Sequence, residues 1–299
     1  MTDNPNSNRH FNKTRIAPTP SGFLHLGNVL SFAITASIAE KTKAKILLRI
    51  DDLDRDRVNK QYVQDIFDTL NFLEIPWDEG PQNYAEYASE YSQLHRMELY
   101  QAALRQLKDS EQVFACTCSR ADVRRNNADD IYPGTCCNKA MPLDAKEASW
   151  RLKTDSAKEI SVNTLQDGFI KTYLPANMQD FIVRKKDGYP AYQLASIIDD
   201  LHFGVDLVIR GEDLWPSTLA QIYLSSQLNV DAFKNGTFHH HALLTEASGI
   251  KLSKSAGDTS VKYLRESGKK AGDIYSEIAK MLGFNERVSN WHELTTLMG

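Results

Sequence analysis

The chain has 299 residues, of which 41% are hydrophobic and 25% charged, as in an ordinary water-soluble globular protein. Its net charge of −4 argues against an indiscriminate nucleic-acid binder, but it leaves room for one RNA held by local patches. The longest apolar stretch, residues 29–39, is interrupted by serine and threonine and falls far short of the roughly 20 residues of a membrane span. Residues 1–11 lack the apolar core of a signal peptide, so we expect a cytoplasmic protein with no membrane partner.

The first 50 residues predict a strand, a helix and a second strand. Residues 14–17 form a β-prone segment that ends at a turn with two prolines and a glycine, residues 18–22. Apolar residues then follow helical spacing over 26–39, and residues 45–50 form an apolar run typical of a strand buried in a parallel sheet. This order predicts a right-handed βαβ unit.

The rest of the chain continues this pattern around an interruption. We expect helices at 60–73 and 89–107, then an inserted subdomain with short strands at 108–178. The α/β pattern resumes at 180–184, with a helix at 192–201, a strand at 205–210 and a helix at 216–228. A lysine-bearing loop at 251–257 precedes a helical segment.

The expected fold class is therefore α/β, with a Rossmann-type parallel sheet split by an insertion. Residues 1–10 are predicted to be a disordered tail. The two halves of the sheet domain are expected at 11–107 and 179–245, on either side of the insertion at 108–178. The loop and a short helical piece occupy 246–299.

Two motifs carry candidate chemistry. His25-Leu26-Gly27-Asn28 lies at the start of the first predicted helix, where backbone N–H groups and the helix dipole attract phosphate. Lys251-Leu252-Ser253-Lys254-Ser255 forms a cationic loop that can neutralise charge on a leaving pyrophosphate. Taken singly, each motif also has an ordinary explanation, as a strand–loop–helix connection or as a solvated basic loop.

Together the two motifs resemble the His-Ile-Gly-His and Lys-Met-Ser-Lys-Ser signatures of class I aminoacyl-tRNA synthetases, with departures at Leu26, Asn28 and Leu252. Four further blocks are similar, in the same order, to glutamyl-tRNA synthetases: RIAPTPSG at 15–22, LRIDDLD at 48–54, PAYQLA at 190–195 with IDD at 198–200, and VIRGEDL at 208–214. The resemblance implies activation of glutamate with ATP and Mg²⁺, followed by transfer to a tRNA.

The resemblance also implies roles for individual residues. Those implied to act in catalysis are His25, Gly27, Asn28, Lys251, Ser253, Lys254 and Ser255, and four of them, His25, Gly27, Asn28 and Lys254, are also implied to bind ATP. Those implied to bind glutamate are Arg15, Ala17, Thr19, Asp51, Tyr192 and Arg210.

Within the glutamate set, Arg15, Tyr192 and Arg210 are expected to hold the side-chain carboxylate, because arginine pairs a carboxylate bidentately and keeps its charge. Thr19 and Asp51 are expected near the amino group. Thr19, Asp51 and Ser196 replace the family's Ser, Glu and Asn. A salt-bridged strand end is the alternative explanation for Arg210.

All four cysteines lie within residues 116–137, which favours a metal site over disulfides in a cytosolic chain. Composition alone favours Cys137 as the fourth ligand beside Cys116, Cys118 and Cys136. The sequence resembles the zinc pattern of short glutamyl-tRNA synthetase paralogues, however, and that pattern implies Tyr132 instead. We therefore expect one structural Zn²⁺ on this set of four, with unmetallated thiols as the alternative.

The chain ends soon after the lysine loop, where full glutamyl-tRNA synthetases continue into an anticodon-binding region. This length resembles the glutamyl-queuosine tRNA(Asp) synthetase family. The resemblance implies glutamyl-adenylate formation without tRNA, then transfer to queuosine in the anticodon of aspartate tRNA. We expect a monomer. The alternatives are a truncated glutamyl-tRNA synthetase that charges the 3′ end of glutamate tRNA, a glutaminyl enzyme, which Arg210 disfavours, and a non-catalytic tRNA-binding paralogue.

Overall fold

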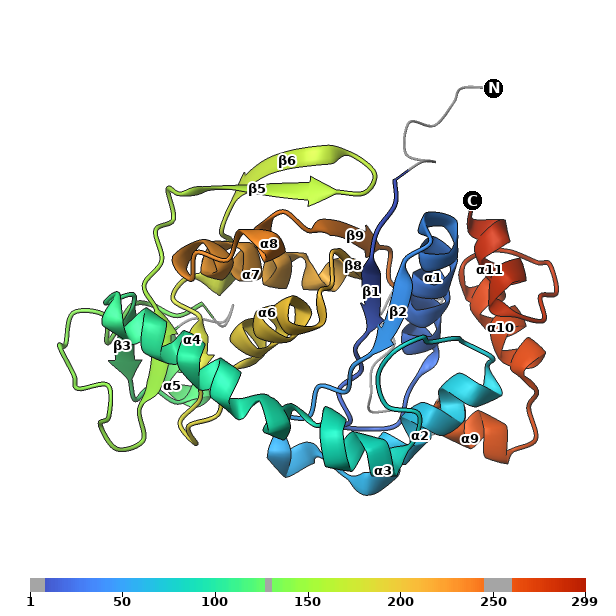
Figure 1. Ribbon diagram of the computed structural model, residues 1–299, viewed down its shortest axis with the longest axis horizontal. Helices are drawn as coiled ribbons and strands as arrows, with labels where there is room; N and C mark the ends of the chain where they lie inside the picture. The colour runs from blue at the N-terminus through green and yellow to red at the C-terminus, as the bar shows by residue number, and fades with distance from the viewer. Residues whose placement is uncertain (1–8, 127–130, 245–259) are drawn as a thin grey trace. The chain divides into compact units, whose positions relative to one another are not determined.

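The computed structural model describes residues 9–126, 131–244 and 260–299, which divide into two compact units (Figure 1). Unit one consists of the described parts of Met1–His95, Leu207–Asp213 and His239–Gly299. Unit two consists of those of Arg96–Asp206 and Leu214–Phe238. The predicted tail up to residue 8 and all of the lysine motif, residues 251–255, lie outside the described residues.

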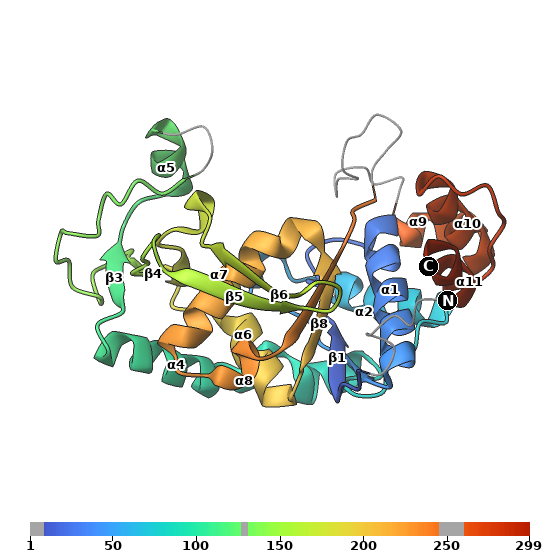
Figure 2. The same cartoon turned by 90° about the horizontal axis from the view of Figure 1, so that it is seen from above.

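Unit one contains the predicted βαβ unit. Strands β1 (Lys13–Ile16) and β2 (Lys45–Leu48) pair in parallel, and α1 (Leu26–Thr42) connects them. Strand β8 (Leu207–Gly211) lies next to β1 in both views (Figures 1 and 2). Strand β9 (Thr237–His241) is the neighbour of β8, and its last three residues belong to this unit.

Helix α1 is buried on most sides because it packs between the strands and two C-terminal helices, α10 (Ala271–Met281) and α11 (Trp291–Met298). A helix in such a position needs apolar or small residues all round, and Val29, Leu30 and Ala33 are fully buried. The unit is completed by α2 (Lys60–Phe72), the short α3 (Tyr84–Glu86) and α9 (Val261–Glu266). Buried packing of α1 fixes the position of its N-terminus, where the first motif lies.

The helix predicted at 89–107 begins later, as α4 (Met97–Asp109). A π turn at Tyr87–Tyr91 and a 3₁₀ turn at Gln93–Arg96 precede it. The cause is a tertiary contact, because Asp52 accepts hydrogen bonds from Ser92 Oγ at 2.6 Å and from the backbone N–H of Gln93 at 2.9 Å. A regular helix through these residues would not present both donors to one carboxylate.

Unit two contains an antiparallel sheet in the order β3 (Val113–Cys116), β4 (Ser149–Leu152), β7 (Ile182–Arg184). A hairpin of β5 (Glu159–Thr164) and β6 (Gly168–Tyr173) pairs in parallel with the first two residues of β9. The helices of this unit are α4, α5 (Arg120–Asn126), α6 (Tyr192–Phe203), α7 (Trp215–Gln227) and α8 (Asp231–Lys234).

The sheets correct one part of the predicted fold class. In place of one parallel sheet, the described strands form three sheets. Strands β1–β2 and β5–β9 pair in parallel, whereas β3–β4, β4–β7 and β5–β6 pair antiparallel. Strand β7, expected to resume the parallel pattern, pairs with β4 instead, and a turn from Lys185 to Tyr189 follows it. A short apolar run predicts a strand but not its partner.

Among the described residues, no helix is long and apolar enough to cross a bilayer.

Candidate active site

His25 lies immediately before α1, at the end of the loop that follows β1. Its backbone N–H donates to Oδ1 of Asn28 at 3.1 Å. Asn28 therefore closes the first turn of the helix, as the third residue of a capping box does. The departure from the family's second histidine thus has a local structural function at the start of α1.

Gly27 is required by its contact with His25. A Cβ on Gly27 would lie 3.1 Å from Cε1 and 3.2 Å from Nδ1 of the His25 ring, closer than side chains normally pack. Glycine therefore allows the imidazole to lie against the first turn of α1.

The described chain resumes after the lysine motif at Ser260, which forms an antiparallel bridge with His25. The next residue, Val261, donates its N–H to the carbonyl of Leu24 at 2.8 Å. Arg265 of α9 forms a salt bridge with buried Asp65 of α2 at 3.1 Å. The end of the lysine loop is thus tied to the first motif, although Lys251, Ser253, Lys254 and Ser255 themselves lie outside the described residues.

Two arginines of the predicted glutamate set come from neighbouring strands of unit one. Arg15 on β1 and Arg210 on β8 are only 5% and 4% exposed. Arg15 Nη1 donates to the carbonyl of Ile209 at 3.1 Å, which fixes the first guanidinium on the strand that carries the second. Ala17 follows β1 directly, and Thr19 lies two residues further on in the same loop.

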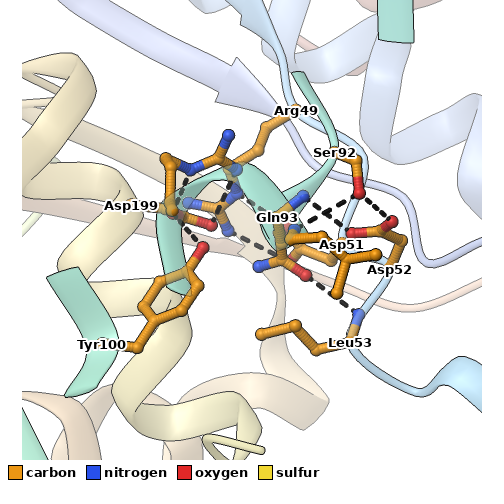
Figure 3. Close-up of polar contacts among 10 residues, drawn as sticks. Arg49, Asp51, Asp52, Leu53, Ser92, Gln93, Tyr100 and Asp199 are labelled. Carbon is orange, nitrogen blue, oxygen red and sulfur yellow. Dashed lines mark hydrogen bonds and ion pairs between the residues drawn. The ribbon is translucent and has the colours of Figure 1, made fainter. Parts of the chain in front are cut away.

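Asp51 does not point its carboxylate to open space. Arg49 donates to it through Nε at 2.7 Å and Nη2 at 3.1 Å, and both side chains are buried (Figure 3). Asp51, one methylene shorter than the family's glutamate, thus forms a bidentate pair with the arginine two residues before it. Its contact with a substrate amino group stays a prediction.

Tyr192 and Ser196 belong to unit two. Tyr192 is the first residue of α6 and is exposed, whereas Ser196 one turn later is buried. Their contacts with substrate stay predictions.

Sequence reasoning missed two buried polar networks (Figure 3). In unit one, Asp52 accepts hydrogen bonds from Tyr87, Ser92, Gln93 and Arg55. In unit two, Asp199 pairs with Arg96 Nε at 2.7 Å and accepts from the hydroxyl of Tyr100 at 2.6 Å. The available signal was an acidic pair inside an apolar motif, Asp51-Asp52 and Asp199-Asp200, because buried carboxylates need several donors.

Three consecutive histidines, His239, His240 and His241, form the part of β9 that lies in unit one, and all have lowered pKa values. Burial lowers the pKa of His239 to about 4, and the neighbouring His241 contributes. Burial also lowers the pKa of His240 to about 3, together with the positive charges of Arg210 and Arg15. Burial outweighs the opposing carbonyl and carboxylate neighbours of His241. The three rings are therefore neutral at physiological pH.

These histidines predict a pH-dependent stability. Below about pH 6.5 the unfolded chain binds protons on imidazoles that stay neutral in the folded chain. The free energy of unfolding therefore decreases as the pH is lowered from about 6.5 to about 4. Each ring contributes on the order of 1 kcal/mol per pH unit in this window. Urea unfolding at about pH 7 and about pH 5.5 measures the slope, which His239→Gln should reduce; an unchanged slope in the variant would contradict this explanation.

The cysteine cluster of unit two brings together the predicted ligands. The Sγ atoms of Cys116, Cys118 and Cys136 lie within 4.8 Å of one another, and the last two are 3.7 Å apart. Two thiolates on one tetrahedral zinc, each about 2.3 Å from the metal, are separated by about 3.8 Å. The Tyr132 hydroxyl lies 3.5 Å from Cys116 Sγ, whereas Cys137 is exposed. The donor set therefore fits zinc, with Tyr132 rather than Cys137 beside the thiols.

Charge around this cluster favours ionised sulfur at one position. Burial opposes ionisation of Cys116, but the Tyr132 hydroxyl and the Arg151 guanidinium outweigh it and lower the pKa of this thiol. Burial and the neighbouring Cys136 raise the pKa of Cys118 to about 12. Arg151 also lies 3.6 Å above the Tyr132 ring.

Comparison with known proteins finds similarity to tRNA synthetases for glutamate and glutamine. Residues 12–291 match the family model described as tRNA synthetases class I (E and Q), catalytic domain. The chain is 32% identical to glutamate–tRNA ligase 2 of Nitrosococcus oceani over 95% of its own length, but it spans only 62% of that protein. It is 34% identical to the glutamyl-Q tRNA(Asp) synthetase of Verminephrobacter eiseniae, covering 90% of this chain and 89% of the relative.

The fold is also found among solved structures. The crystal structure of a glutamate-tRNA synthetase from Elizabethkingia anophelis superposes with a TM-score of 0.75 at 24% identity, over 95% of this chain and 65% of the other.

Proposed function

Because the chain belongs to the class I tRNA synthetase family for glutamate and glutamine, we propose that it is an ATP-dependent ligase that activates glutamate and transfers it to a tRNA. The observation that carries this proposal is the pair of buried guanidiniums, Arg15 and Arg210, on neighbouring strands of the unit that holds the His25 motif. Two buried cations stabilise a carboxylate and gain much less from an amide, so they favour glutamate over glutamine.

In the proposed first step, an oxygen of the glutamate α-carboxylate attacks the α-phosphorus of ATP, and pyrophosphate leaves. The carboxylate is already a nucleophile, so the protein contributes positioning and charge stabilisation. The first turn of α1, with His25 and Gly27, offers N–H groups to phosphate. Lys251 and Lys254 are proposed to neutralise the leaving group, with Ser253 and Ser255 beside them, and Mg²⁺ accompanies ATP.

For the second step we propose queuosine in aspartate tRNA as the acceptor. Support comes from relatives named glutamyl-Q tRNA(Asp) synthetase, of which the chain covers 86% to 89% in three cases. The second candidate acceptor is the 3′ end of glutamate tRNA, because other relatives of similar identity are named glutamate–tRNA ligase. The chain spans 62% and 54% of those proteins.

Glutamate-dependent ATP–pyrophosphate exchange without tRNA tests the first step. Transfer of labelled glutamate to aspartate tRNA with and without queuosine, and to glutamate tRNA, then tests the acceptor. Label only on queuosine-containing tRNA supports the proposal. Exchange that needs glutamate tRNA would favour a glutamyl-tRNA synthetase, and RNA binding without any exchange would favour a non-catalytic paralogue.

The thiol cluster is proposed to hold one structural zinc on Cys116, Cys118, Tyr132 and Cys136. Zinc would stabilise this small subdomain by joining the segments that carry its ligands. We expect about one zinc per chain by elemental analysis. Cys136→Ser should lose most of the zinc and lower the midpoint of thermal unfolding. Cys137→Ser, at the exposed neighbouring cysteine, should keep the zinc content and the midpoint of the wild type. Equal zinc content in the two variants would contradict the site.

Gly27→Ala is expected to raise the KM for ATP about tenfold, because the added methyl group displaces the His25 ring from the phosphate-binding turn. Gly22→Ala, in the loop just before α1, is the matched control, since a Cβ there meets nothing within 4 Å. Steady-state exchange at saturating glutamate measures both. Similar KM values for the two variants would show that the position of His25 does not matter for ATP binding.

A further inference from the structure

The three histidines of β9 differ in what they face. Side chains alternate along a strand, so His240 points to the opposite face from His239 and His241. His241 bonds to the carbonyl of Ala242 at 2.9 Å and has acidic neighbours on the segment after β8. His240 instead has two cationic neighbours, Arg210 and Arg15.

The strand order explains this arrangement. Strand β9 lies next to β8, which carries Arg210, and β8 lies next to β1, which carries Arg15. Three neighbouring strands of unit one therefore bring two guanidiniums and one imidazole together. The sequence motifs of the family resemblance included both arginines but not His240.

Burial and the neighbouring positive charges together set the state of the imidazole. Burial disfavours the charged ring, and a third cation beside two buried guanidiniums is unfavourable as well, so the lowered pKa of His240 keeps the ring neutral. A neutral imidazole has one N–H donor and one acceptor nitrogen. A carboxylate offers only acceptors, so the ring can add a donor to the site without adding charge.

We propose, on the basis of the function proposed above, that His240 is a specificity-determining residue of the glutamate site, whose ring N–H donates to the side-chain carboxylate of the substrate beside Arg210 and Arg15. The second ring nitrogen is then an acceptor for a guanidinium N–H, which orients the arginine. In this arrangement the two guanidiniums neutralise the substrate carboxylate, and the imidazole donates a further hydrogen bond to that carboxylate.

The test compares His240→Leu, which has no donor, with His240→Gln, which retains an N–H, and with His239→Leu on the opposite face of the same strand. ATP–pyrophosphate exchange gives KM values for glutamate and for ATP separately. His240→Leu should raise the KM for glutamate about tenfold or more, the factor for one hydrogen bond to a charged group, and change that for ATP less than about twofold. His240→Gln should recover most of the loss, and His239→Leu should change neither KM.

Thermal unfolding identifies any variant that fails to fold, and His240→Met then serves as the second donor-free variant. Three results would overturn the role of His240 and leave the proposed function intact: equal increases of both KM values in His240→Leu, no recovery in His240→Gln, or the same effect in His239→Leu. Absence of glutamate-dependent exchange in the wild-type protein would overturn the proposed function, and the assignment of His240 with it.

Discussion

Arg210→Ala is expected to lower kcat/KM for glutamate by about a hundredfold or more in ATP–pyrophosphate exchange. Arg210 is only 4% exposed, so in the variant the substrate carboxylate would enter a buried site that has lost one of its two cations. Removing one partner of a buried ion pair costs about 3–5 kcal/mol, which corresponds to a factor of a hundred to a few thousand. The preference for glutamate over glutamine should fall in the same variant, because the lost interaction is specific to the charged substrate.

Two further variants separate charge from geometry and from general damage. Arg210→Lys keeps the charge but not the planar fork, so we expect a loss of about tenfold. Arg287→Ala, at an exposed arginine of the same unit, should leave exchange unchanged. If Arg210→Ala raised the KM for ATP as much as that for glutamate, or retained exchange, Arg210 would be a structural residue at a strand end.

The helices that the sequence predicted well are those whose signal is local. Apolar spacing over 26–39 and 60–73 predicted α1 and α2 to within a few residues. The spacing of apolar residues along the sequence indicates which sides of a helix are buried, so it predicts the helix without knowledge of its partners. The interruption at 87–96 could not be predicted in this way. It depends on Asp52, whose carboxylate lies 35 to 41 residues away in sequence from its donors there.

The candidate site shows the same division. The family resemblance pointed to Arg15 and Arg210, and the structure places them on adjacent strands of one unit. Asp51 is held by the buried guanidinium of Arg49, a contact that the motif does not specify. His240 carried no distinctive signal either, since three successive histidines do not reveal which of them faces a pair of arginines.

Asp52→Ala is expected to lower the free energy of unfolding by about 3 kcal/mol or more. The carboxylate is fully buried and accepts from Tyr87 Oη at 2.7 Å, Ser92 Oγ at 2.6 Å and Gln93 N at 2.9 Å. Each buried donor left without an acceptor costs about 1–3 kcal/mol, and these donors cannot reach water without unfolding the turn at 87–96. Urea unfolding measures the loss.

Asp54→Ala is the control, two residues along the same loop. Its carboxylate is half exposed and lies 3.6 Å from Arg57, so we expect a change below about 1 kcal/mol. Asp52→Asn, which keeps the shape but loses the charge, should fall between the two. If Asp52→Ala were no more destabilising than Asp54→Ala, the interruption before α4 would have to be set by the local sequence of 87–96 rather than by the buried carboxylate. If the large loss is found, the Asp51–Arg49 pair beside Asp52 should also be disturbed, and exchange activity should fall in the Asp52 variant even at temperatures where it remains folded.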